Sequence, residues 1–247
     1  MKRIIFINIA VLLAFSPVFG QGEIRARGDF LKSREQTKSV GKPIPKLRKQ
    51  PTANRYQPPV GLGYTVFLKD EAEGWMRVST KRAFISGQQI KVLLETNIDG
   101  YLYIFHQEND QPITLFFPNL KIQNGNNQIK ANRPLLVPEG NAWRFDHKPA
   151  IETLTFIVSR VPMKGIPIGG ALNQVAGFRP PQDVLQQIMT AANPLEDSVA
   201  DEGKTMTKSE QRRGIELVPT DPAPTSIFMS QTEREERVVV RLKLTHK

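Results

Sequence analysis

The segment from Gly87 to Asn119 constrains the fold of this chain more than any other. Apolar residues alternate with others in Ile90–Thr96, Tyr101–His106 and Ile113–Phe117, and polar stretches rich in Asn, Asp and Gly separate the three runs. A period of two is typical of β-strands, and Asn, Asp and Gly favour tight turns. The segment therefore predicts three consecutive β-strands whose large aromatic side chains fill one core.

Similar runs on both sides extend this pattern. They cover residues 63–69, 75–79, 133–138 and 153–161, and prolines around 133–138 suggest an edge strand. Short strands at this spacing, without helical periodicity between them, indicate an antiparallel β-sandwich over residues 60–163. Residues 237–247 alternate in the same way, so we expect the last segment to return to the sandwich as its closing strand.

Residues 164–236 differ in kind and are interpreted as a loop and short-helix insertion. Pro180-Pro181 precedes an amphipathic stretch that predicts a helix ending before Asn193-Pro194. Thr207 to Glu210 fits a capping box for a second short helix that extends to Gly214. Residues 195–205 and 219–225 lack such patterns and are expected to be poorly ordered. The first helix either docks on the sandwich and covers a sheet edge, or offers its apolar face to a partner.

The N-terminus predicts export. Lys2 and Arg3 precede an apolar run that ends near Phe15, and small residues lead up to Gly20. This is the pattern of a secretory signal peptide over residues 1–20, since the run is shorter than the roughly 20 residues of a membrane span. The alternative is an uncleaved anchor. After cleavage no transmembrane segment is expected, and the predicted location is the periplasm or the exterior.

Residues 21–59 form a basic arm that is rich in Pro, Lys and Arg. They contain 10 Lys and Arg against 3 Asp and Glu, within a chain of net charge +10. Few large apolar residues are available to offset chain entropy, so the arm is expected to be disordered. It either contacts an anionic membrane or glycan through its charge, or serves only as a solvated linker.

The composition excludes several kinds of chemistry. The chain has no cysteine, which rules out a lipid-modified cysteine, disulfides, thiolate metal sites and cysteine nucleophiles. Nucleic acid is not an expected partner despite the charge, because the basic residues show no interleaved aromatic pattern.

Several short sequence elements follow one another between residues 86 and 160. The elements are Ser86-Gly87, Asn97 with Asp99–Tyr103, Leu115–Asn119, Leu136–Pro138, and Glu152–Leu154 leading to Ser159-Arg160. In order and spacing they resemble a bacterial family known as domain of unknown function 4384, and the final strand resembles that family's last strand. The resemblance implies an immunoglobulin-like β-sandwich. The family assigns no catalytic residues, so none are transferred to this chain.

The sequence contains no established catalytic motif, and we assign no catalytic, cofactor-binding or metal-binding residues and no cofactor. The chain has only three histidines. Ser86, Asp99 and His106 could form a triad only if the fold brought them together, and their spacing does not indicate it. Asp146 and His147 are adjacent, but neighbours in a strand point to opposite faces, which disfavours a shared site.

Two binding sites are conceivable in the turns and on the aromatic residues. Asp99 and Asp110, with neighbouring asparagines, could contribute oxygen ligands to calcium, although turn chemistry also explains them. Trp75, Tyr101 and Tyr103 could form an exposed platform for a glycan or a peptide, although their spacing fits core packing better.

These features favour a non-catalytic, exported β-sandwich module that contacts an unidentified protein in the cell envelope, with exposed sheet edges as the docking surface. The alternative is a domain that binds envelope glycan or calcium at the turns around Asp99 and Asp110. A hydrolase with a site at Asp146 and His147 is the least favoured hypothesis.

Overall fold

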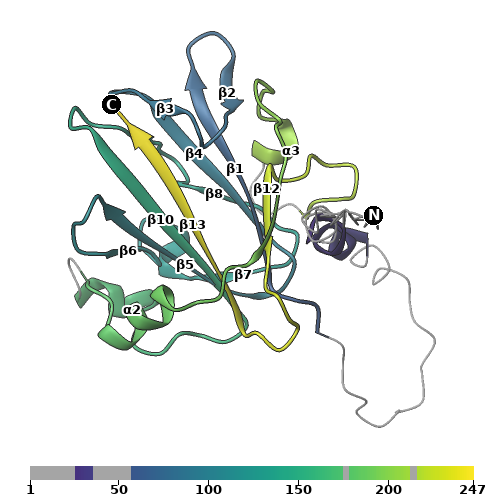
Figure 1. Cartoon of the computed structure of the whole chain (residues 1–247), viewed down its shortest axis with the longest axis vertical. Coiled ribbons are helices and arrows are strands. Elements are labelled where there is room, and N and C mark those ends of the chain that lie inside the picture. Colours follow the sequence, from purple (N-terminus) through teal and green to yellow (C-terminus); the bar gives the residue numbers. More distant parts are fainter. Residues whose placement is uncertain (1–25, 36–56, 175–177, 212–215) are drawn as a thin grey trace, which may run out of the picture.

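The computed structural model describes residues 26–35, 57–174, 178–211 and 216–247. It contains two β-sheets packed face to face, with the helices outside them (Figure 1). The predicted signal peptide and most of the basic arm lie outside the described residues. Within those residues, no helix combines the length and the apolar character that a membrane crossing requires.

The first sheet, sheet A, has the strand order β11-β12-β1-β4-β8, with β2 paired to β1 and β9 paired to β4. Its strand pairings are antiparallel. The strands are β1 (Gly61–Asp70), β2 (Gly74–Arg77), β4 (Gln89–Thr96), β8 (Leu135–Val137), β9 (Trp143–Arg144), β11 (Leu195–Ser198) and β12 (Ser226–Met229).

The second sheet, sheet B, has the order β3-β13-β10-β5-β6, with β7 paired to β5. Strand β13 pairs with β3 in parallel, unlike the antiparallel pairings of the longer strands. The strands are β3 (Ala83–Phe84), β5 (Gly100–Glu108), β6 (Thr114–Phe117), β7 (Gln128–Ile129), β10 (Ala150–Ser159) and β13 (Arg237–His246), and two 3-10 helices span Gln123–Gly125 and Gly169–Gln174.

One continuous apolar core lies between the sheets. Because side chains alternate along a strand, every second residue of β10 and β13 points into it. Tyr64 anchors the centre, with its ring 6.2 Å from that of Phe156 across the sandwich and 5.6 Å from that of Phe228. The predicted sandwich is therefore confirmed. The immunoglobulin-like topology that the resemblance implies stays a prediction.

The strands expected from alternation are all present. The predicted edge strand is β8, which ends sheet A, and the predicted closing strand is β13, which pairs with β10 along its whole length. Five further strands were not predicted from the sequence: β3, β7, β9, β11 and β12. Each has four residues or fewer, too short for alternation to be recognised.

The expected insertion over residues 164–236 needs correction, because part of it belongs to the sandwich. Strand β12 pairs with β1, and β11 extends the sheet beyond β12. All four residues of β12 are buried, so its sequence shows no alternation between a buried and an exposed face. Residues 195–205 were also expected to be poorly ordered, yet they contain β11 and end in a bridge between Thr205 and Met76.

The two predicted helices of this region are present, although the predicted extension of the second to Gly214 lies outside the described residues. Helix α2 (Gln182–Met189) places Val184 and Ile188 on the outer face of sheet B. Its docking on the sandwich is confirmed, but it covers the face of the sheet and not an edge, because its apolar residues meet the outward side chains of the central strands. Helix α3 (Lys208–Gln211) begins with the predicted capping box. The Thr207 amide donates to Glu210 Oε2 at 2.8 Å, and the Glu210 amide donates to Thr207 Oγ1 at 3.4 Å.

Residues 26–35 are helical, where the sequence predicted a disordered arm. This helical segment packs on the outer face of sheet A beside β12 (Figure 1) and buries Ala26 and Phe30. Gly61 makes room for it, since a Cβ there would lie 2.7 Å from the Phe30 ring. The prediction of disorder for this segment was wrong because it rested on the composition of the whole arm. Locally, Ala26 and Phe30 are four residues apart and share one face of the helix, which can be buried.

A buried ion pair fixes the helical segment to sheet A. Arg34 donates from Nε to Glu95 Oε1 at 2.7 Å and from Nη2 to Glu95 Oε2 at 2.5 Å, and both side chains are almost fully buried. Burial raises the pKa of Glu95, and the Arg34 guanidinium opposes that shift. Arg27 Nε lies 3.1 Å from Asp197 Oδ1 in a second, less buried ion pair. Two cations of the basic arm are thus engaged within the fold.

Replacing Glu95 with leucine should destabilise the protein by about 3–5 kcal/mol, because Arg34 is then left buried without its carboxylate. The double variant Arg34→Met with Glu95→Leu should lose markedly less, since no charge is left buried. Denaturant unfolding of the three proteins measures the difference. Equal losses in the single and double variants would contradict the account.

Candidate functional site

The core changes from apolar to polar at one end of sheet B. In the neighbouring strands β5, β10 and β13, the side chains of His106, Glu152 and His246 are in phase with the core-facing apolar residues and lie near the same end of the sheet. The strand register aligns them, because Leu154 lies opposite His106 and Ala150 lies opposite His246. Three polar side chains therefore meet on the inner face of the sheet at the same end.

Together with Asp146, these three residues form a histidine–carboxylate cluster of His106, Asp146, Glu152 and His246. His106 Nε2 lies 2.5 Å from Glu152 Oε2. His246 Nδ1 lies 3.9 Å from Glu152 Oε1, and its Nε2 lies 3.4 Å from Asp146 Oδ1. Both His246 contacts have ion-pair distances without hydrogen-bond geometry, although the ring is only 2% exposed. His246 thus stands between the two carboxylates, with its ring 5.1 Å from that of Phe145.

A cavity of about 280 Å³ opens beside the cluster; we call it the end pocket. Three members of the cluster line it on the polar side. Phe116 and Trp143 form an aromatic wall with ring centroids 4.9 Å apart, and both rings are partly exposed. The remaining lining residues are Ile90, Arg144, Phe145, Leu154 and Leu244.

The electrostatics of the end pocket keep Asp146 ionised. The Lys148 amide donates to Asp146 Oδ1 at 2.8 Å, and this bond is the main reason that the pKa of the Asp146 carboxyl is lowered. His246 adds to the effect. Asp146 is exposed and sits at the mouth of the pocket, whereas Glu152 is largely buried inside it.

The catalytic groupings considered from the sequence do not assemble. Ser86 Oγ lies 2.7 Å from His147 Nδ1, and His106 contacts Glu152 instead of Ser86. Asp99 and His106 lie toward opposite ends of β5, so the triad is excluded. Asp146 faces His246 while its neighbour His147 faces Ser86, so this pair also does not form one site.

The calcium site considered at Asp99 and Asp110 is wrong. Strand β5 has 9 residues and separates the two turns by roughly 30 Å at about 3.3 Å per residue. Asp99 accepts from Lys130 Nζ at 2.8 Å and from the Ala131 amide at 3.0 Å. Burial raises its pKa, but these bonds outweigh it and lower the pKa overall. Among the described residues, no group of three or more His, Asp or Glu could hold a metal ion.

The aromatic platform considered at Trp75, Tyr101 and Tyr103 does not form. Tyr103 is fully buried under α2 and its hydroxyl accepts from the Met163 amide at 2.8 Å. Trp75 belongs to the other sheet, where Lys91 Nζ lies 4.8 Å from its ring centre. Core packing, the interpretation that the sequence favoured, is confirmed for Tyr103.

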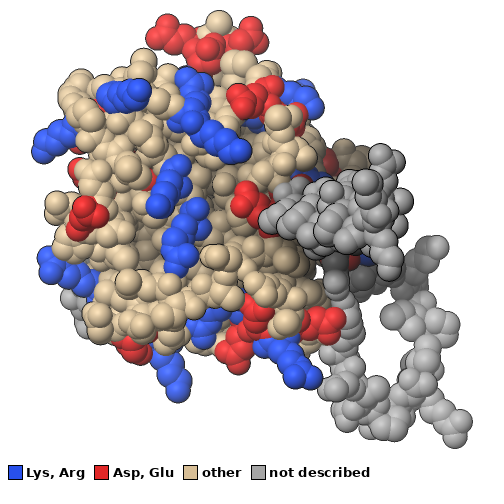
Figure 2. Space-filling model, viewed as in Figure 1, with Lys and Arg blue, Asp and Glu red and all other residues tan. Residues whose placement is uncertain are grey.

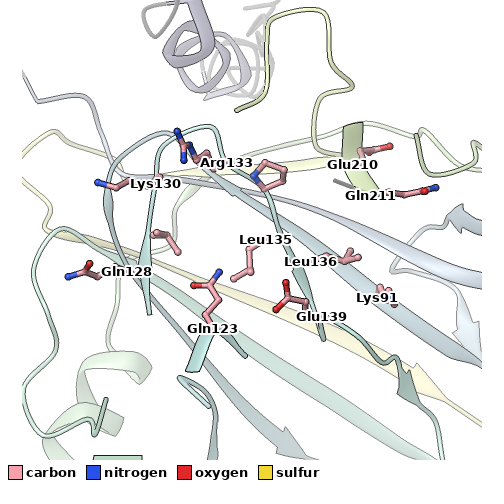
Figure 3. Close-up of a pocket in the computed structure, with 12 residues that line it drawn as sticks. Lys91, Gln123, Gln128, Lys130, Arg133, Leu135, Leu136, Glu139, Glu210 and Gln211 are labelled. Carbon is pink, nitrogen blue, oxygen red and sulfur yellow. The ribbon is translucent and has the colours of Figure 1, made fainter. Parts of the chain in front are cut away.

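A second hollow, which we call the edge groove, follows the free side of β8 and has a volume of about 370 Å³. Figure 3 shows Leu135 and Leu136 in its middle, with Lys130 and Arg133 toward one end and α3 toward the other. Strand β8 pairs with β4 on one side only, and no strand of the described residues pairs with its outer side. The groove follows one edge of sheet A, but within β8 only Leu136 is partly exposed, while Leu135 and Val137 are buried.

Glu152 and His246 were not singled out from the sequence, although a signal for both was present. Each lies in phase with the core-facing apolar residues of its own strand, yet carries an ionisable group. A polar residue in phase with a buried face marks the point where a core gives way to a site. This pattern indicates a shared site only once the strand order is known, because β10 and β13 must be neighbours for the two side chains to meet.

The fold and pocket define a two-sheet β-sandwich with an open polar end. Residues 83–162 match the family model described as "Domain of unknown function (DUF4384)", which confirms for this segment the resemblance found in the sequence. No curated protein and no solved structure was found to match the chain. The matched segment runs from β3 past β10 and contains most of the end pocket, but His246 lies outside it.

Asp146 should make stability depend on pH. Its folded-state pKa lies below the ordinary value of 3.8, so its contribution is present above that value and is lost as the pH falls toward the lowered one. Asp146→Asn should therefore be less stable than the parent protein near neutral pH, and the difference should vanish in strong acid. Unfolding free energies across this range test the prediction; a difference that does not change with pH would contradict it.

Proposed function

We propose that this protein is an exported, non-catalytic β-sandwich module that binds another protein in the cell envelope. The edge groove along β8 carries the proposal. A sheet edge can take up an extended segment of a partner through main-chain hydrogen bonds, while side-chain pockets supply specificity. The signal peptide predicted over residues 1–20 supports export.

The groove favours a short contact. Pro134 and Pro138 flank β8 and lack the amide hydrogen that a longer strand pairing needs, so a partner could pair at most with the stretch between them, in which only Leu136 is partly exposed. Leu136 faces away from the sandwich core, next to the cluster around Phe67. A partner segment would therefore pair over about one pleat and be held mainly by its side chains.

The charges favour an acidic partner segment. Lys91, Lys130 and Arg133 line the groove, against Glu139 and Glu210. Glu210 is held by Arg77 at 2.5 Å and Lys130 is held by Asp99 at 2.8 Å, so these two charges are largely neutralised. Lys91 and Arg133, the latter 3.9 Å from Glu216, remain as the basic side chains that a partner would meet. Basic side chains also gather over β10 and β13 on the face in Figure 2, where Arg241 and Lys243 are exposed. Such a field attracts acidic surfaces.

A non-catalytic role agrees with the cluster geometry. Ser86 and His147 form an exposed pair, and Asp146, the carboxylate next in sequence, faces His246. A serine nucleophile needs a base that is itself oriented by a third group. The second candidate function, ligand binding, is favoured by the end pocket and is developed below.

A photo-crosslinking amino acid at Gln128, an exposed position of the groove, should capture an acidic protein segment in cells that export the protein. The same probe at Lys164, an exposed position outside the groove, is the matched control. Lys130→Glu with Arg133→Glu should abolish the Gln128 adduct because the rim charge is reversed, while Lys164→Glu should preserve it. Mass spectrometry identifies the adducts.

An adduct specific to Gln128 and lost in the charge-reversed variant supports the groove as the docking surface. Equal adducts at both positions, or an adduct that survives charge reversal, would reject the groove and the acidic partner together.

A further inference from the structure

We propose that the end pocket binds a single ring of an uncharged carbohydrate. The pocket is separate from the edge groove, so this inference does not depend on the proposed protein contact. It rests on the size of the cavity, its aromatic wall, its mixture of charges and the way in which its carboxylates are held.

The size and the wall match one sugar ring. A volume of about 280 Å³ falls just below the roughly 300–1,000 Å³ of pockets for drug-sized ligands, so the occupant is small. Phe116 and Trp143 offer partly exposed ring faces, and Leu154 and Leu244 close the inner end. One face of a sugar ring presents mainly C–H groups, which pack favourably against an aromatic side chain.

The charges in the pocket favour a neutral, hydroxylated ligand. Asp146 and Glu152 offer acceptors, whereas Arg144 is a donor and His106 presents an imidazole. The two carboxylates repel an anion, and the guanidinium of Arg144 repels a cation. A hydroxyl group both donates and accepts, so neighbouring hydroxyls on one ring can satisfy carboxylates and cationic donors together.

The carboxylates are held in place before any ligand arrives. Glu152 is fixed from one side by His106 at 2.5 Å, and Asp146 is fixed by the Lys148 amide. His246 lies behind both, and its two buried ring nitrogens have no hydrogen-bond partner of their own among the described residues. The two carboxylates are therefore positioned by His106 and by the Lys148 amide.

The pocket can be entered from solvent. The Asp146 side chain is 62% exposed and the His106 side chain 36% exposed, so the polar rim faces outward. Glu152 is less exposed, at 19%, so this carboxylate lies deeper than Asp146. A ring entering past Asp146 can therefore reach both the aromatic wall and Glu152.

The chain has two tryptophans, which makes a direct test possible. In Trp75→Phe, Trp143 is the only tryptophan, and its emission should change in a saturable way on titration with glucose, galactose or N-acetylglucosamine. In Trp143→Phe, the remaining Trp75 lies outside the pocket, and its emission should not respond. Sorbitol has the hydroxyls without the ring and should bind far more weakly.

The polar contacts are tested separately. Glu152→Gln should weaken binding about tenfold or more, because a hydrogen bond to a charged acceptor is lost. Glu73→Gln, which changes an exposed carboxylate in the turn before β2, should leave binding unchanged. Circular dichroism verifies folding, and saturation-transfer NMR on the unaltered chain repeats the titrations without any substitution.

The proposal is overturned if none of the three sugars gives a response in either measurement, or if arginine or citrate binds at the pocket in their place. It is also overturned if Glu152→Gln binds sugar as tightly as the parent protein. The crosslinking at the edge groove does not involve this pocket, so the two proposals can fail independently.

Discussion

The pairing of β13 with β10 is the interaction on which both the sandwich and its site depend. The two strands are in register along ten residue pairs, and β13 in turn pairs with β3. The last residues of the chain therefore complete sheet B, between strands that come much earlier in the sequence. The same register brings His246 beside Glu152. Because side chains alternate with a period of two, a shift of one residue would turn His246 out to solvent and leave the carboxylates without it.

Sheet A is organised by a different constraint, the burial of charge on its outer face. Arg77 contacts Asp201 at 2.6 Å and Glu210 at 2.5 Å, and Arg34 contacts Glu95. These pairs tie the helical segment 26–35 and the region around α3 to the sheet. Buried ion pairs contribute little net stability compared with apolar contacts, but breaking one is costly. Here they connect the segments that cover the outer face of sheet A to its strands β2 and β4.

The sequence predicted the long strands because alternation sustained over several residues is produced by a half-buried β-strand and by little else. It did not predict β12, whose four residues are all buried, or the helical segment around Phe30, whose order depends on a distant glutamate. The site was predicted least well. The turn aspartates Asp99 and Asp110 drew attention because they resemble ligands, yet a nine-residue strand separates them. Glu152 and His246 become neighbours only through strand order, which local patterns do not determine.

The register of β13 can be measured directly by NMR. Nuclear Overhauser effects between the backbones of β10 and β13 should pair Ala150 with His246, Glu152 with Leu244 and Leu154 with Leu242. This result would place the His246 ring inside the sandwich, between the two carboxylates. Contacts displaced by one residue, with Ile151 opposite His246, would place the ring outside and contradict both the histidine–carboxylate cluster and the end pocket.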